Sequence, residues 1–167
     1  LGIDLGGTKI KAAILNNNGH MIWQKRQQTS KLSYDETITR ITGLVDDARQ
    51  STGFAGPIGI GVPGSIRRST GKSQGASLTY LNNRDLQSDL KSALNTDVRM
   101  ANDANCFALS EATDGAGKGC EVVFGLILGT GCGSGIVING RPLSGINGIA
   151  GEVGHNPLPW PITDEYL

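Results

Sequence analysis

A short apolar segment that ends in a glycine pair opens the chain, and this feature constrains the fold most. Residues 1–9 read Leu-Gly-Ile-Asp-Leu-Gly-Gly-Thr-Lys, and an apolar pattern typical of a strand resumes over residues 10–15. The pattern predicts a strand, a tight turn at Gly6 and Gly7, and a second strand. Because glycine lacks a Cβ, its backbone can approach a phosphate group closely. The alternative is an ordinary hairpin in which the glycines only make the turn.

The polar residues of this segment suit nucleotide binding. Thr8 adds a hydroxyl and Lys9 adds a cation directly after the glycine pair. Asp4 has a carboxylate, which is a ligand that Mg²⁺ accepts. We therefore interpret Gly6, Gly7, Thr8 and Lys9 as candidates for phosphate binding, and Asp4 as a weaker candidate for Mg²⁺.

A second glycine turn repeats this arrangement near the end of the chain. Residues 128–135 read Leu-Gly-Thr-Gly-Cys-Gly-Ser-Gly and lie between apolar runs at 122–128 and 135–139. Its backbone amides and hydroxyls could hold a polyphosphate from the opposite side. A glycine-rich segment at 115–119 marks a hinge between the two units. We expect two α/β domains that face each other over a cleft, divided into residues 1–115 and 116–167.

The middle of the chain alternates strands and helices. Ser33 and Glu36 fit a capping box that begins a helix, and Gly53 ends it. The hydrophobic spacing predicts short strands and further helices at residues 57–62, 85–95, 98–101 and 102–112.

Asp103 is the best candidate for a catalytic group. It follows a strand, begins a helix, and lies between Asn102 and Asn105. Phosphoryl transfer to an alcohol needs a carboxylate that orients the hydroxyl and accepts its proton. The alternative is that Asp103 only caps its helix. Glu152 and His155 are three residues apart, so one helical turn would bring them together to bind a polyol.

A Gly-x-Gly-x-x-Gly match at residues 59–64 is not read as a dinucleotide site. Pro63 lies inside it and no helical pattern follows. We expect a loop near a substrate at Gly64 instead.

Composition and charge indicate which partners and which compartment to expect for this protein. The 167 residues include 15 basic and 15 acidic ones that do not cluster, which argues against nucleic acid or an anionic membrane as a partner. No apolar run approaches the roughly 20 residues that span a bilayer, and no secretory signal is visible. Three cysteines without Cys-x-x-Cys spacing indicate free thiols in a reducing compartment, so we expect a cytoplasmic protein.

Five motifs together resemble the ROK family (repressors, open reading frames, kinases) over essentially the whole chain. They lie, in the order and spacing of the family, at residues 4–9, 61–64, 102–105, 128–131 and 151–155. Within the family, the chain looks most like bacterial fructokinases of broad hexose specificity. The N-acetylglucosamine kinases are a close second, and N-acetylmannosamine kinases belong to the same alternative.

This resemblance implies an actin-like ATPase (RNase H-like) fold, with ATP and a hexose in the cleft between two domains. It implies transfer of the γ-phosphate to a sugar hydroxyl, usually the 6-OH, with Asp103 as the general base and Mg²⁺ near Asp4. The sugar would be held by Gly64, Ser77, Asn102, Asp103, Glu152 and His155. The phosphate path would be lined by Gly6, Gly7, Thr8, Gly129, Thr130 and Gly131, with Lys9 a weaker candidate because its side chain can point away.

Some family features differ or are missing. Ser77 stands where many relatives carry an Asn, which leaves the preferred hexose open. Family members usually continue with a cysteine-rich Zn²⁺ motif, to which His155 would add one ligand, whereas this chain stops at Leu167. We therefore expect an N-terminal domain plus the start of the second, inactive as a fragment. Relatives often form dimers, so a homodimer is the protein partner that the resemblance allows.

Two other functions stay open. A sugar-sensing repressor of the same family would carry a DNA-binding helix-turn-helix before Leu1, and no basic recognition helix occurs in the chain itself. A non-catalytic actin-like protein would bind nucleotide without phosphorylating sugar.

Overall fold

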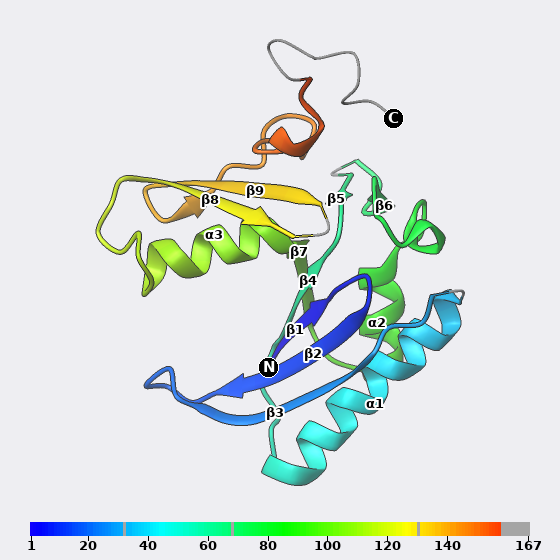
Figure 1. The fold of residues 1–167 in the computed structure, drawn as a ribbon. Coiled ribbons are helices and arrows are strands. Elements are labelled where there is room, and N and C mark those ends of the chain that lie inside the picture. Colours follow the sequence, from blue (N-terminus) through cyan, green and yellow to red (C-terminus); the bar gives the residue numbers. More distant parts are fainter. Residues whose placement is uncertain (32, 68, 130, 158–167) are drawn as a thin grey trace.

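The computed structural model describes residues 1–31, 33–67, 69–129 and 131–157, with His155 described by its backbone only. Its larger sheet has five strands in the order β3-β2-β1-β4-β7 (Figure 1). The first three are an antiparallel meander, and β4 and β7 run parallel to β1. The strands are β1 (Gly2–Leu5), β2 (Lys9–Leu15), β3 (Met21–Gln28), β4 (Ile58–Val62) and β7 (Val98–Asn102).

Two helices cover one face of this sheet, namely α1 (Tyr34–Thr52) and α2 (Leu86–Leu94) (Figure 1). Alternate strand residues are buried against them, because successive side chains of a strand point to opposite faces. The resulting core includes Leu5, Ile10, Ile58, Val62 and Val98, all at most 1% exposed. Short elements follow β4: β5 (Ser65–Ile66), β6 (Ser73–Gln74) and the 3₁₀ helix η1 (Thr79–Leu81).

The ends of α1 confirm the predicted signals. Ser33 Oγ accepts a hydrogen bond from the Glu36 amide at 3.2 Å, and Gly53 ends the helix with a φ of 69°. The capping box is modified, because the Glu36 carboxylate accepts from Ser30 Oγ at 2.6 Å. The beginning of α1 is thereby tied to the segment that precedes it.

A smaller antiparallel sheet, in the order β10-β9-β8, packs on α3 (Asp103–Thr113) (Figure 1). Its strands are β8 (Val122–Leu128), β9 (Cys132–Ile138) and β10 (Arg141–Pro142), and the 3₁₀ helix η2 (Val153–His155) follows. From the sequence we expected the strand after the second glycine turn to begin at residue 135. In the structure this strand, β9, begins at Cys132, so the glycine turn is shorter than expected.

Glycines in this sheet allow the helix to approach. A Cβ on Gly135 would lie 2.6 Å from the Ala104 carbonyl oxygen, and one on Gly125 would lie 2.9 Å from the Ala108 Cβ. These contacts explain why the glycine-rich pattern continues past the turn. Gly135 therefore serves helix–sheet packing, whereas the sequence assigned it to a phosphate-binding turn.

The expected hinge at residues 115–119 is a hydrogen-bonded turn attached to the end of α3. Glu111 Oε2 accepts from the Ala116 amide at 2.8 Å, and the Glu111 carbonyl accepts from the Gly117 amide at 2.9 Å. Since α3 contacts β4 and β7 as well as β8 and β9, it joins the two sheets. The division of the chain at residue 115 stays a prediction.

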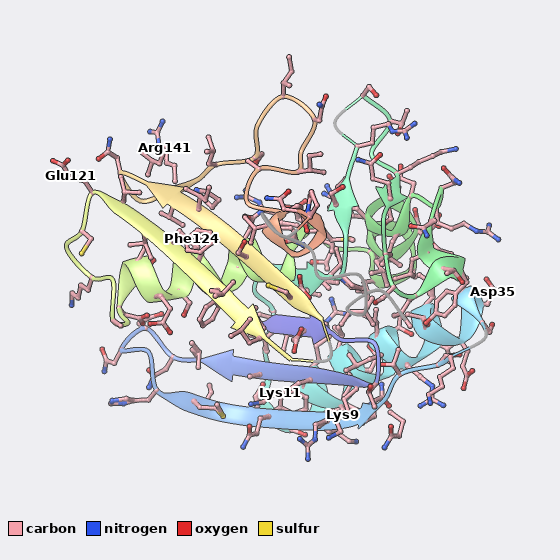
Figure 2. The ribbon with its side chains drawn as sticks, turned by 45° about the horizontal axis from the view of Figure 1, so that its top comes forward. Lys9, Lys11, Asp35, Glu121, Phe124 and Arg141 are labelled. Carbon is pink, nitrogen blue, oxygen red and sulfur yellow. The ribbon has the colours of Figure 1, made fainter. Side chains whose placement is uncertain are left out.

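The face of β8 that points away from α3 is apolar and exposed. Phe124, which Figure 2 labels on this strand, is 52% exposed, and Leu128 is 76% exposed. The described residues contain no helix that is both long and apolar enough to cross a membrane.

Candidate active site

A cleft of about 880 Å³ lies at the carboxyl edge of the larger sheet, where β1, β4 and β7 end. Parallel strands of α/β proteins commonly present ligand sites at this edge. Its other wall comes from the turn between β8 and β9. Nine of the residues selected from the sequence line it: Gly7, Thr8, Gly64, Ser77, Asn102, Asp103, Gly129, Gly131 and Glu152.

Asp103 lies between the two glycine turns, at the junction of β7 and α3. Its Oδ1 accepts hydrogen bonds from the Ala104 amide at 2.8 Å and from Asn102 Nδ2 at 3.1 Å. Burial raises the pKa of the half-buried Asp103 carboxyl, and hydrogen bonds from the Ala104 amide, its own amide and Asn102 oppose part of that rise. A carboxylate with a raised pKa accepts a proton more readily, as a general base must.

The N-cap of α3 is Asn102, so Asp103 is not needed for that role. Asn102 Oδ1 accepts from the Asn105 amide at 2.9 Å, and Asn102 Nδ2 also donates to the Gly64 carbonyl at 2.8 Å. The two amide hydrogens are therefore used by Gly64 and Asp103. Asn102 therefore connects the end of β7 to the Gly64 turn and to the Asp103 carboxylate by hydrogen bonds, whereas the family resemblance implied only a contact with the sugar.

Gly64 occupies a position that requires glycine. Its φ is 77°, and a Cβ there would lie 2.5 Å from the Gln74 carbonyl oxygen. The turn after β4 can thus lie directly against residues 74–76. A Cβ on Gly61, in β4 itself, would lie 3.6 Å from the Asp103 Cα, which is an ordinary van der Waals distance. Of the three glycines in the Gly-x-Gly-x-x-Gly match, Gly64 is thus the one whose position requires glycine, and no described atom lies within 4 Å of a Cβ placed on Gly59.

The two glycine turns leave backbone open to the cleft. A Cβ on Gly7 would lie 3.8 Å from Ser77 Oγ, and no described atom lies within 4 Å of a Cβ placed on Gly129 or Gly131. Gly6 differs, because its amide donates to the Lys9 carbonyl at 3.0 Å and closes the turn. Thr130 lies outside the described residues.

Asp4 and Lys9 are absent from the described residues that line the cleft. Lys9 is exposed on β2, two residues before Lys11 (Figure 2). Asp4 on β1 lies opposite Lys11 on β2 in the antiparallel strand register. Burial and the nearby charge of Asp103 raise the pKa of the Asp4 carboxyl, and Lys11 lowers it. Asp4 is therefore close enough to Asp103 for their charges to interact.

Glu152 reaches the cleft from the segment that follows β10. It precedes η2, which lies against β9, and the Gly151 carbonyl accepts a hydrogen bond from Ser134 Oγ. The side chain of His155 is outside the described part, so its expected contact with Glu152 stays a prediction. The described residues contain no group of three or more His, Cys, Asp or Glu side chains that could hold a metal ion.

Sequence reasoning missed several residues of the cleft. They lie on β5, on β6 and the loop after it, beside the β8–β9 turn, and between β10 and η2: Ser65, Gln74, Gly75, Leu78, Ile127, Cys132 and Ile149. Three of them, Gly75, Leu78 and Ile149, are in irregular segments without hydrophobic periodicity, and the other four lie at the ends of short strands or beside the β8–β9 turn. Gly75, with a φ of 65°, carried the clearest signal, since it follows the Pro63-Gly64 turn in a polar segment.

Comparison with known proteins agrees with this architecture. The family model described as "ROK family" matches residues 1–165. The chain belongs to the ROK family. Solved ROK structures have the actin-like ATPase fold, which confirms the expected fold class.

Two ROK structures superpose closely on the chain. One is a glucokinase from Streptomyces griseus in complex with glucose and AMPPNP, at 29% identity and a TM-score of 0.84, covering 93% of this chain and 49% of that one. The other is the ROK hexokinase from Thermus thermophilus, at 32% identity and a TM-score of 0.81, covering 94% and 52%.

Curated ROK relatives include the N-acetyl-D-glucosamine kinase of Pectobacterium carotovorum subsp. carotovorum. It is 47% identical over 158 residues, which are 95% of this chain and 52% of that protein. The chain thus spans about half the length of the curated relatives that it matches.

Proposed function

We propose that the full-length protein is an ATP-dependent N-acetyl-D-glucosamine kinase. The observation that carries the proposal is the position of Asp103 in one cleft between the glycine turns at Gly7 and Gly129. The choice of sugar rests on the curated N-acetyl-D-glucosamine kinase at 47% identity. This relationship favours the alternative from the sequence over the fructokinase that the motifs suggested first.

In this proposal, Asp103 is the general base. Its carboxylate orients the acceptor hydroxyl, for which we propose the 6-OH, and takes the proton as the oxygen attacks the γ-phosphate. The hydroxyl oxygen forms a bond to phosphorus, the bond to the β-phosphate oxygen breaks, and ADP leaves with those electrons. Positioning and electrostatic stabilisation supply most of such catalysis.

The lining residues fit ATP, and Asp4, which is outside the described lining but close enough to Asp103 for their charges to interact, is the candidate ligand for Mg²⁺. Gly7 and Gly129 leave space in which a Cβ would stand, and Thr8 adds a hydroxyl, so the triphosphate can lie along backbone amides. Asp4 would hold Mg²⁺ together with water and phosphate oxygens, and the ion would neutralise charge on the transferred group. It would also reduce the repulsion between Asp4 and Asp103.

The sugar side of the cleft is polar. We assign Ser77 and Glu152 to hydroxyl groups of the sugar, with the Gly64 turn beside them. His155 is assigned to the same sugar on the family motif. Zinc binding by His155 would need ligands that lie beyond Leu167, and no step of this mechanism uses it.

A steady-state comparison of sugars tests the proposed function. The full-length protein is assayed with ATP and N-acetylglucosamine, N-acetylmannosamine, glucose or fructose, and the product is located by NMR. We expect the highest kcat/KM for N-acetylglucosamine and phosphate on its 6-oxygen. A higher kcat/KM for fructose would restore the first interpretation, and ATP binding without phosphorylation of any sugar would favour a non-catalytic protein.

A further inference from the structure

Two segments that line the cleft, the turn at residues 6–8 and the loop at residues 76–82, are connected by hydrogen bonds through residues 29–30. Thr29, directly after β3, is 5% exposed. Its Oγ1 donates to the Gly6 carbonyl at 2.7 Å, and its amide donates to the Thr8 carbonyl at 2.9 Å. Thr29 therefore fixes both ends of the turn that the proposed function assigns to phosphate.

Ser30, the next residue in the chain, connects this segment to the loop that carries Tyr80. The Ser30 carbonyl accepts a hydrogen bond from Tyr80 Oη at 2.6 Å. Tyr80 Oη also lies 2.9 Å from Thr37 Oγ1, which is on the buried face of α1. The half-buried Tyr80 thus ties η1 to Ser30, the residue that directly follows Thr29.

The loop that carries Tyr80 is braced internally. Asn82 Oδ1 accepts from the Ala76 amide at 3.0 Å, and Asn82 Nδ2 donates to the Ala76 carbonyl at 3.3 Å. Ser77 and Leu78, which line the cleft, lie in the chain between Ala76 and Asn82, which these bonds join. A shift of Tyr80 would therefore also move Ser77, which the proposed function assigns to the sugar.

We propose that Tyr80 is a positioning residue that sets the distance between the sugar loop at 76–82 and the phosphate turn at 6–8. The inference rests on the proposed function of these two segments. Phosphoryl transfer depends on how the acceptor oxygen is aligned with the γ-phosphate, so a small displacement slows the chemical step. Of these two segments, the sugar is assigned to Ser77 and the phosphates to Gly7, so we expect the affinity for each substrate alone to depend much less on that distance than the chemical step does.

The substitution Tyr80→Phe in the full-length protein tests this role, because it removes one hydroxyl and keeps the ring. Tyr34→Phe is the matched control, since Tyr34 Oη donates to Asp89 on α2 at 2.5 Å and this hydrogen bond involves neither residues 6–8 nor residues 76–82. We expect Tyr80→Phe to lower kcat about three- to tenfold, the effect of one lost hydrogen bond. Dissociation constants of the sugar alone and of an ATP analogue alone should change less than about twofold.

Hydrogen exchange provides a readout that does not depend on sugar phosphorylation. The Thr29 amide should exchange faster in Tyr80→Phe than in the wild type, and Tyr34→Phe should leave it unchanged. If the wild type phosphorylates no sugar, the proposed function fails while the exchange still tests the connection. Equal exchange at Thr29 in the wild type and Tyr80→Phe would overturn the inference. In an active enzyme, equal kcat for Tyr80→Phe and Tyr34→Phe would also overturn it.

Discussion

The side-chain amide of Asn102 donates a hydrogen bond to Oδ1 of the adjacent Asp103 at 3.1 Å. The same amide donates to the Gly64 carbonyl, and its oxygen caps α3. One side chain therefore orients the proposed base, ties it to the turn after β4, and begins the helix. Several consequences of this arrangement can be measured.

Replacing Asn102 should affect stability and catalysis separately. Asn102→Ala removes the helix cap, which costs about 1 kcal/mol, and also removes the donor to Asp103. Asn102→Ser keeps a capping oxygen and should recover most of the free energy of unfolding. It should not recover kcat, because it lacks the planar amide that reaches both Asp103 and Gly64. Urea unfolding and steady-state kinetics of both variants check this, and full recovery of kcat by Ser would contradict it.

The same change predicts a shift in the pH profile. The hydrogen bond from Asn102 lowers the pKa of Asp103, so its removal should raise that pKa further. Because the base must be ionised, the acidic limb of kcat/KM should move to higher pH in Asn102→Ala. An acidic limb at the wild-type position would show that another group controls it.

Asp103→Asn should stabilise the fold at neutral pH. The folded-state pKa of Asp103 is raised, mainly by burial, so ionisation costs folding free energy above that pKa. The gain in the free energy of unfolding of Asp103→Asn over the wild type should disappear as the pH falls through the raised pKa, because the wild-type carboxyl then becomes neutral. Asp97 is a control for which we expect the opposite sign, because the hydrogen bond that its carboxylate accepts from Lys91 lowers its pKa. Asp97→Asn should lose stability at neutral pH, and this loss should vanish in acid.

Two glycines with similar backbone conformation should respond differently to alanine. Gly64 and Gly75 have φ values of 77° and 65°, so alanine costs about 1–2 kcal/mol at either position. Only at Gly64 would the new Cβ also meet backbone, at 2.5 Å from the Gln74 oxygen. Gly64→Ala should therefore be less stable than Gly75→Ala by about a further 1–3 kcal/mol. Equal unfolding midpoints and m-values would contradict the close approach.

Glycines of the second sheet should separate nucleotide binding from folding. Gly131 faces the cleft with no described atom within 4 Å of its Cβ position, whereas Gly135 contacts Ala104. Gly131→Ala should raise the KM for ATP with little change in melting temperature. Gly135→Ala should lower the melting temperature, because the helix must move away. The reverse pattern in thermal unfolding and kinetics would contradict the two assignments.

The sequence was sufficient for the features that follow from local chemistry. The capping signal at Ser33, the αL glycine at Gly53 and the two strand–turn–strand units all occur as expected. The division of roles among glycines could not be predicted, because it depends on contacts between distant elements. Gly6 closes a turn, Gly7 faces the cleft and Gly135 packs on α3.

The sugar side of the cleft was less predictable for the same reason. Ser77 was selected on a family pattern, but Leu78 and Ile149 reach the cleft only through loops that have no periodicity. The structural use of Asn102 was also missed. Its role depends on Gly64, which is 38 residues away in the chain.

The most direct test of the central claim is the kcat of full-length Asp103→Asn with ATP and N-acetylglucosamine. Asp35→Asn is the control, because Asp35 lies at the start of α1 and outside the described cleft lining. We predict that Asp103→Asn lowers kcat by about 10²- to 10⁴-fold without lowering the melting temperature, and that Asp35→Asn retains wild-type kcat. A kcat for Asp103→Asn within a fewfold of the wild type would contradict the assignment of Asp103 as the base.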